Sequence, residues 1–149
     1  MWNAKPVLEV LDLSHNAFTG SFQFMNGKLH ESFRKLQYLD LSHNNFHGGL
    51  SELAGIFCHI SPKGGSLQEL RLNHNDFTGE VPSCLMQFRR LNFLALNNNR
   101  LSGALPEVTA PELVILALHK NELSGVLPQN LHMLRQGVLQ LMHAAGIAR

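Results

Sequence analysis

Leucine recurs along this chain in a short unit whose apolar places are fixed. The unit is L-x-x-L-x-L-x-x-N, and it begins five times, at Leu8, Leu36, Leu67, Leu91 and Leu113. The leucines at places 4 and 6 flank a polar or small residue at place 5, which is the period-2 pattern of a short strand with one buried face. Self-similarity at this spacing predicts a row of parallel strands, each packing on the units before and after it.

The segment that follows each unit is repeated as well. An apolar residue stands two places after the asparagine, and a glycine stands two places after that residue. The glycines are Gly20, Gly48, Gly79, Gly103 and Gly125. Because glycine suits a positive φ or a close backbone approach, we expect such a backbone at each of them. In the last three units a proline follows, at Pro82, Pro106 and Pro128.

These places together resemble the plant-type class of the leucine-rich repeat family, whose unit is L-x-x-L-x-L-x-x-N-x-L-x-G-x-I-P. The resemblance implies an α/β solenoid, a right-handed superhelix with a short parallel β-sheet on its concave face and irregular or 3-10 turns on its convex face. We expect one leucine-rich repeat domain over residues 1–149. The third and fourth units fit the family's period of about 24 residues. The first two carry extra residues at 23–28 and 60–65, and a degenerate sixth unit begins near residue 136.

Asparagine occupies place 9 of every unit, where the chain leaves the strand. These residues are Asn16, Asn44, Asn75, Asn99 and Asn121. The side-chain amide has both a donor and an acceptor, so it can satisfy backbone groups left open at the turn. We therefore expect an asparagine ladder that supports the scaffold and takes no part in a binding site.

Solvent-facing places of the strands form columns, because stacked strands lie about 4.8 Å apart. By resemblance, the binding function of the family lies on this concave surface. Our candidate ligand-binding residues at places 3 and 5 are Val10, Asp12, Tyr38, Asp40, Glu69, Arg71, Phe93 and Ile115. The column at place 3 is mostly apolar, and exposed aromatic side chains on a rigid sheet favour contact with a peptide or protein. Place 5 is acidic at the N-terminal end, which suits a basic ligand segment. By resemblance, aspartate is also common at this place in the family, so the alternative is that these are consensus residues.

Histidine fills place 8 of the first three units, at His15, His43 and His74. Three histidines in one column raise the alternatives of a metal site and a pH-sensitive face. Zinc ligands converge on one point at about 2.0–2.1 Å, whereas side chains in a flat column point outward in parallel. We therefore predict no metal site and leave the pH-sensitive face open.

The two cysteines, Cys58 and Cys84, fall in neighbouring units but at different places around them. A disulfide requires Cα atoms about 5.5 Å apart. The sequence therefore predicts two reduced, mostly buried thiols.

Composition excludes several classes of function. The formal net charge of +1 leaves no basic footprint for nucleic acid. No apolar run reaches the roughly 18 residues that a membrane span needs, and Met1–Val7 lacks the apolar region of a signal peptide. Motifs for a nucleophile elbow, a phosphate-binding loop or a metalloprotease are absent, so we predict no enzyme and no cofactor.

The sequence therefore predicts a non-catalytic module that binds a protein or peptide through its concave face. The resemblance implies a receptor-like, defence or signalling context, or an inhibitor of a secreted wall-degrading enzyme. The alternatives are a truncated structural fragment that self-associates through uncapped ends and an intracellular adaptor. The expected location is the extracellular or plasma-membrane face for part of a receptor-like protein, and the cytoplasm if the chain is complete as given.

Overall fold

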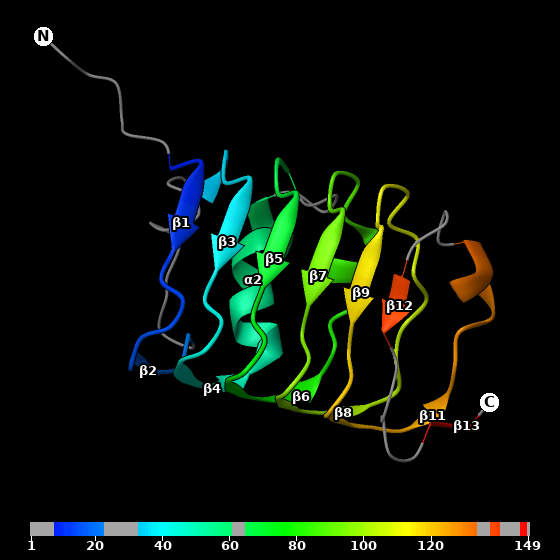
Figure 1. The fold of residues 1–149 in the computed structure, drawn as a ribbon. Coiled ribbons are helices and arrows are strands. Elements are labelled where there is room, and N and C mark those ends of the chain that lie inside the picture. The colour runs from blue at the N-terminus through cyan, green and yellow to red at the C-terminus, as the bar shows by residue number, and fades with distance from the viewer. Residues whose placement is uncertain (1–7, 23–32, 61–64, 134–137, 141–146, 149) are drawn as a thin grey trace, which may run out of the picture.

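The computed structural model describes residues 8–22, 33–60, 65–133, 138–140 and 147–148, which form a solenoid of stacked coils (Figure 1). Each coil begins at one of the five leucine-rich units, and its strand faces the same side as the strands of its neighbours. The six parallel strands of this first sheet are β1 (Val10–Asp12), β3 (Tyr38–Asp40), β5 (Glu69–Arg71), β7 (Phe93–Ala95), β9 (Ile115–Ala117) and β12 (Val138–Gln140), and they follow one another in that order. The predicted solenoid with a parallel sheet is confirmed.

The register of the first sheet aligns equal places of successive units. Val10 pairs with Tyr38, Tyr38 with Glu69, and the same shift continues through Phe93 and Ile115. The column predicted at place 3 is therefore a physical row across the sheet, and β12 extends its backbone by one strand.

A second parallel sheet runs along the side of the solenoid and was not expected from the sequence. Its strands follow the asparagine of each unit, in the order β10-β8-β6-β4-β2. They are β2 (Thr19–Gly20), β4 (Asn45–Gly49), β6 (Asp76–Glu80), β8 (Arg100–Gly103) and β10 (Glu122–Leu123). A further pair joins β11 (Gly125–Val126) to β13 (Ile147–Ala148). Each coil is thus hydrogen-bonded to its neighbours along two edges.

The repeated glycines adopt the backbone expected of them. Gly48 has a φ of 93° and Gly103 a φ of 74°. A Cβ atom on Gly48 would lie 2.8 Å from Cβ of Ser21, and one on Gly103 would lie 2.8 Å from Cγ of Glu80. Both conformation and space therefore exclude a side chain here.

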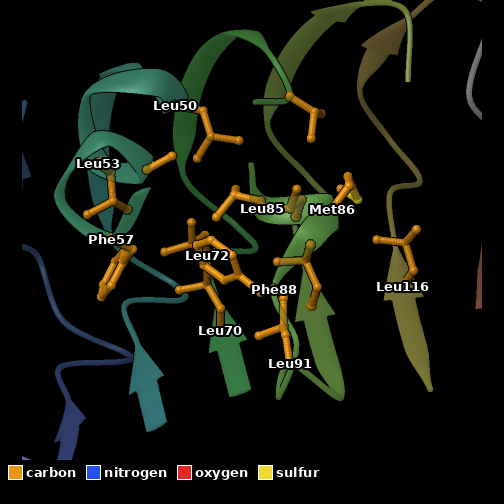
Figure 2. Packing of buried hydrophobic residues seen from close by; sticks show 14 of the residues in the cluster. Leu50, Leu53, Phe57, Leu70, Leu72, Leu85, Met86, Phe88, Leu91 and Leu116 are labelled. Carbon is orange, nitrogen blue, oxygen red and sulfur yellow. The ribbon is translucent and has the colours of Figure 1, made fainter. Parts of the chain in front are cut away.

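The convex side differs from the prediction in one coil. The 3-10 helices η1 (Leu85–Gln87) and η2 (Gln129–Met133) match the expected short turns. The second coil instead carries a regular α-helix, α2 (Leu50–Ile60), which lies behind β3 and β5 (Figure 1). Its apolar residues recur at helical spacing, and Leu50, Leu53 and Phe57 point into the core (Figure 2).

The core is a line of leucine layers between the first sheet and the convex turns. Leucines at places 1, 4 and 6 of the second to fifth units are almost fully buried. Phe88 and Met86 from the convex side of the third coil pack against Leu72 and Leu91 in the same interior (Figure 2). The first coil lacks a neighbour on one side among the described residues, and Leu8 is accordingly 37% exposed.

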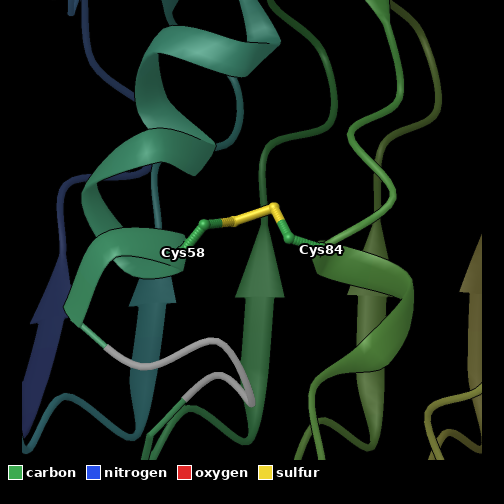
Figure 3. Close-up of a disulfide and its surroundings, with 2 residues drawn as sticks. All are labelled: Cys58 and Cys84. Carbon is green, nitrogen blue, oxygen red and sulfur yellow. A yellow bond between two sulfur atoms is a disulfide. The ribbon is translucent and has the colours of Figure 1, made fainter.

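The two cysteines form a disulfide, so the prediction of reduced thiols was wrong. Cys58 lies on α2 and Cys84 directly precedes η1 in the next coil, with their Cα atoms 6.0 Å apart (Figure 3). The physical reason is the unforeseen helix. It runs along the convex face and brings Cys58 beside the turn of the following coil, although the two residues occupy different places in their units.

Several expectations lie outside the described residues. These are the N-terminal segment 1–7, the insertion at 23–28, residues 61–64 of the second insertion and the end of the sixth unit at 141–146. Within the described part of the chain, no helix has the length and apolar character needed to cross a membrane.

Candidate functional site on the concave face

The concave face presents the place 3 side chains in a row. Val10 is 61% exposed, while Tyr38, Glu69, Phe93 and Ile115 are half-buried. The short strands fix the Cα positions of these residues, because each pairs in register with both neighbours. The row combines large apolar surface with a rigid backbone, which is the combination that limits the entropy lost on binding.

Arg71 connects the two aromatic residues of the row. Its guanidinium carbon lies 4.4 Å from the ring centroid of Phe93 and 5.7 Å from that of Tyr38. One terminal nitrogen of Arg71 also donates to Oε2 of Glu69 at 3.1 Å. Arg71 Nε is buried and has no hydrogen-bond partner among the described residues. The charge is therefore held between two aromatic faces, an arrangement that favours a fixed guanidinium plane.

Asp40 lies beneath this surface, whereas the sequence predicted it as an exposed residue of the column at place 5. It is only 6% exposed. Its Oδ2 accepts a hydrogen bond from the Tyr38 hydroxyl at 3.1 Å, and its Oδ1 accepts one from the Ser42 backbone N–H at 2.8 Å. Asp40 thus orients the Tyr38 ring. In the first coil the equivalent Asp12 remains exposed, and Ser14 N–H donates to its Oδ1 at 2.9 Å.

The chemistry around Tyr38 changes its ionisation. Burial raises the pKa of the Tyr38 phenol above 10.0, and the negative charge and hydrogen bond of Asp40 raise it further. Tyr38 is the only tyrosine of the chain, so phenolate absorbance reports on it alone.

We expect a spectrophotometric titration to show a midpoint above the ordinary tyrosine value of about 10. The Asp40→Asn variant should lower that midpoint, because it removes the charge that opposes phenolate formation. Glu122→Gln, on the lateral sheet, serves as the control and should leave the midpoint unchanged. Equal midpoints in wild type and Asp40→Asn would contradict the hydrogen bond between Tyr38 and Asp40.

The fourth and fifth coils make the C-terminal half of the face apolar. Place 5 is alanine in both, and Ala95 and Ala117 are each 5% exposed. Phe93 and Ile115 flank these methyl groups at place 3, and Val114 adds an exposed apolar side chain at place 2. Places 2, 3 and 5 of this half therefore offer contact surface without charge.

The three histidines at place 8 stack along the edge of the first sheet. The ring centroids of His15 and His43 lie 4.1 Å apart and those of His43 and His74 lie 4.0 Å apart, with nearly parallel planes. Two unit charges at this separation repel by about 1 kcal/mol in water. Burial lowers the pKa of His74 below its ordinary value, and the positive charges that His43, Lys120 and His119 can carry lower it further.

Place 8 has a backbone role that the sequence analysis missed. His15, His43, His74, Asn98 and Lys120 all have φ values between 54° and 56°. Asparagine tolerates this left-handed conformation better than most residues. The asparagine at place 8 of the fourth unit, Asn98, is therefore the residue from which the left-handed backbone of this place could have been predicted. Within the described chain, no three His, Cys, Asp or Glu side chains are placed to hold a metal ion.

The place 9 asparagines connect each coil to the one before it. In Asn75, Oδ1 accepts from Phe46 N–H at 3.0 Å, and Nδ2 donates to the carbonyl oxygens of Leu41 at 2.9 Å and Leu72 at 3.2 Å. Asn44, Asn99 and Asn121 make equivalent bonds to the preceding coil. Among the described residues, the side chain of Asn16 bonds to carbonyls of its own coil and to none of another coil. The asparagines therefore join the strands into one scaffold beneath the concave face.

The Leucine Rich Repeat family model matches residues 7–32, 35–60 and 66–88, and the chain belongs to this family. Receptor-like protein 54 of Arabidopsis thaliana is 38% identical over 99 residues, which cover 66% of this chain and 11% of that protein. The chain thus spans a small part of the length of the receptor-like protein that it resembles.

Solved plant receptor structures share the fold. A crystal structure of a Pollen Receptor Kinase 3 aligns with a TM-score of 0.80 at 24% identity, over 95% of this chain and 64% of that one. The Arabidopsis receptor kinase HAESA, solved with the peptide hormone IDA and the co-receptor SERK1, aligns with a TM-score of 0.71 at 33% identity. That alignment covers 85% of this chain and 20% of the HAESA chain.

Proposed function

We propose that this chain is a non-catalytic, receptor-like recognition module that binds a peptide or protein segment across its concave face. The observation that carries the proposal is the cluster of Tyr38, Arg71 and Phe93, in which a guanidinium lies between two half-buried aromatic rings on three successive strands. Aromatic residues and arginine are the side chains that most often dominate the energy of protein interfaces. Val10 and Ile115 extend the same row at either end.

The similar proteins support a ligand of this kind. HAESA was solved with a bound peptide hormone, and this chain shares its fold over the aligned region. The disulfide supports a location outside the cytosol, because such bonds persist in oxidising compartments. These observations support our proposal of a location at the extracellular or plasma-membrane face and of a signalling context.

The proposal is tested with a displayed library of random 12-residue peptides panned on the oxidised chain. We expect selected peptides to bind at least about tenfold more weakly to Tyr38→Ala and to Phe93→Ala, because each change removes an aromatic contact and one side of the Arg71 site. Fluorescence anisotropy measures the affinity, and circular dichroism checks that the fold is retained.

Phe18→Ala provides a matched control, because Phe18 is an aromatic residue that is 46% exposed but follows the strand and lies off the concave row. If the selected peptides bind Tyr38→Ala and Phe93→Ala as tightly as wild type, the binding site does not lie on this face.

Light scattering on the same samples addresses self-association through the exposed apolar residues of the first coil. Polymers that grow with concentration, together with a failure to select peptides, would favour that structural alternative.

A further inference from the structure

Charge is divided unevenly along the concave face. In the first three coils its strand places carry the carboxylates of Glu9, Asp12, Asp40 and Glu69 against the single guanidinium of Arg71, which leaves a formal charge of −3. The equivalent places in the fourth and fifth coils carry one formal charge, that of Lys120. The whole chain has a formal net charge of +1. The concave face of the first three coils is therefore negative, whereas the remainder of the chain is positive overall.

The carboxylates differ in their freedom to bind a ligand. Glu69 is already paired with Arg71, and both oxygens of Asp40 accept internal hydrogen bonds. Asp12 is exposed, and hydrogen bonds from the backbone N–H and the side chain of Ser14 lower its carboxyl pKa, so this side chain is ionised at neutral pH. Glu9 is exposed and accepts a hydrogen bond from Gln37 Nε2 at 3.3 Å. Asp12 and Glu9 are therefore the carboxylates most accessible to a ligand, and the other two contribute to the field.

The stacked histidines border this acidic half on the same three coils. The charged groups that interact with them are Asp12, beside His15, and His119 and Lys120 of the fifth coil, beside His74. The other charged groups of this half, Glu9, Asp40, Glu69 and Arg71, lie on the strands of the same three coils. Protonation of the stack would add up to three positive charges next to a formal charge of −3. Full protonation of the stack would therefore bring the formal charge of this half to zero, so acidification weakens the local field.

We infer that the concave face takes a partner segment with lysine or arginine side chains over the first three coils and apolar side chains over the last two, and that protonation of the histidine stack weakens this binding. The inference rests on the proposed function, because it names the partner of the same face. Long-range attraction raises the rate at which a basic segment arrives, and the apolar half and the aromatic cluster hold it afterwards. Acidification reduces the attraction without changing the apolar contacts.

The test pans the peptide library described above at pH 7.5, using peptides with capped termini and without histidine, so that the chain supplies the titrating groups. We expect the selected pool to be enriched in lysine and arginine over the starting library. Selected peptides should bind about tenfold more weakly at pH 5.5 than at pH 7.5. Asp12→Asn combined with Glu9→Gln should weaken binding at pH 7.5 and remove the enrichment.

The variant His15→Asn, His43→Asn, His74→Asn isolates the histidine stack. Asn98 already holds the same left-handed backbone at place 8, so the replacement is compatible with the fold. We expect it to retain affinity at pH 7.5 and to lose most of the difference between the two pH values. If it fails to fold by circular dichroism, His15→Asn combined with His43→Asn should lose most of the pH effect, because burial lowers the pKa of the remaining His74.

The outcomes separate the two proposals. A pool that depends on Tyr38 and Phe93 but shows no enrichment in basic residues would overturn this inference and leave the proposed function standing. A pH dependence that survives the histidine replacements would overturn the role of the stack. A pool that depends on neither Tyr38 nor Phe93 would instead overturn the proposed function.

Discussion

Removing the disulfide between Cys58 and Cys84 should lower the free energy of unfolding by about 3–4 kcal/mol, through the double variant Cys58→Ala, Cys84→Ala. The bond closes a loop with a sequence separation of 26 residues, so it restricts the unfolded chain substantially. In the folded state it ties α2 to the next coil, where neighbouring leucines are packed. This change is the largest that we expect from any pair of substitutions outside the leucine core.

Urea denaturation followed by circular dichroism measures this effect, with and without a reductant. The reductant should destabilise the wild type to nearly the level of the double variant and leave the double variant unchanged. A count of free thiols under denaturing conditions should find none in the oxidised wild type. A reductant effect of equal size on both proteins would show that it acts on something other than this bond.

The Asn75→Ala variant should lose about 1–3 kcal/mol of stability, because a backbone donor is left without a partner away from water. The carbonyl oxygens of Leu41 and Leu72 that Asn75 contacts retain a second asparagine donor, and that of Asn73 retains the His43 N–H. Phe46 N–H, by contrast, has Asn75 Oδ1 as its acceptor. The loss therefore arises from one orphaned N–H and from the missing link between two coils.

Asn16→Ala is the matched control in the same unit position. Asn16 is exposed, and its side-chain bonds within the described part of the chain stay in its own coil, so its replacement should change the stability by less than about 0.5 kcal/mol. Thermal or urea denaturation of the two variants side by side gives the comparison. Equal losses would mean that the asparagine shapes its own turn and that its bond to the preceding coil contributes little.

The repeat encoded most of the fold because each of its places performs the same task in every coil. The six strands, their register and the glycine conformations follow from places that recur along the chain. Features that occur in one coil carry no such signal. The helix α2 arises from apolar residues at helical spacing between Leu50 and Phe57, a pattern that lies outside the leucine-rich unit, and the disulfide depends on where that helix ends.

The candidate site was predictable in its backbone and less so in its side chains. The place 3 row follows from register alone, so Tyr38 and Phe93 could be placed on the same face from the sequence. Which groups lie over or under the row depends on side-chain conformation. Arg71, on the strand between the two aromatic residues, lies against both the Tyr38 and the Phe93 ring. Asp12 and Asp40 share a place in the unit and make the same bond to the backbone N–H two residues on. They differ in exposure because Asp40 lies beside Arg71 of the next strand and beneath the Tyr38 hydroxyl.

The spacing between strands of the first sheet determines which spacing of ligand side chains can match the row. Tyr38 and Phe93 stand on strands two steps apart, and with about 4.8 Å per step their backbones are about 9.6 Å from each other. A polyproline II segment advances about 3.1 Å per residue and repeats its orientation every three residues, or about 9.3 Å. A segment in that conformation laid across the strands would therefore present the same face every second coil, at the spacing of Tyr38 and Phe93.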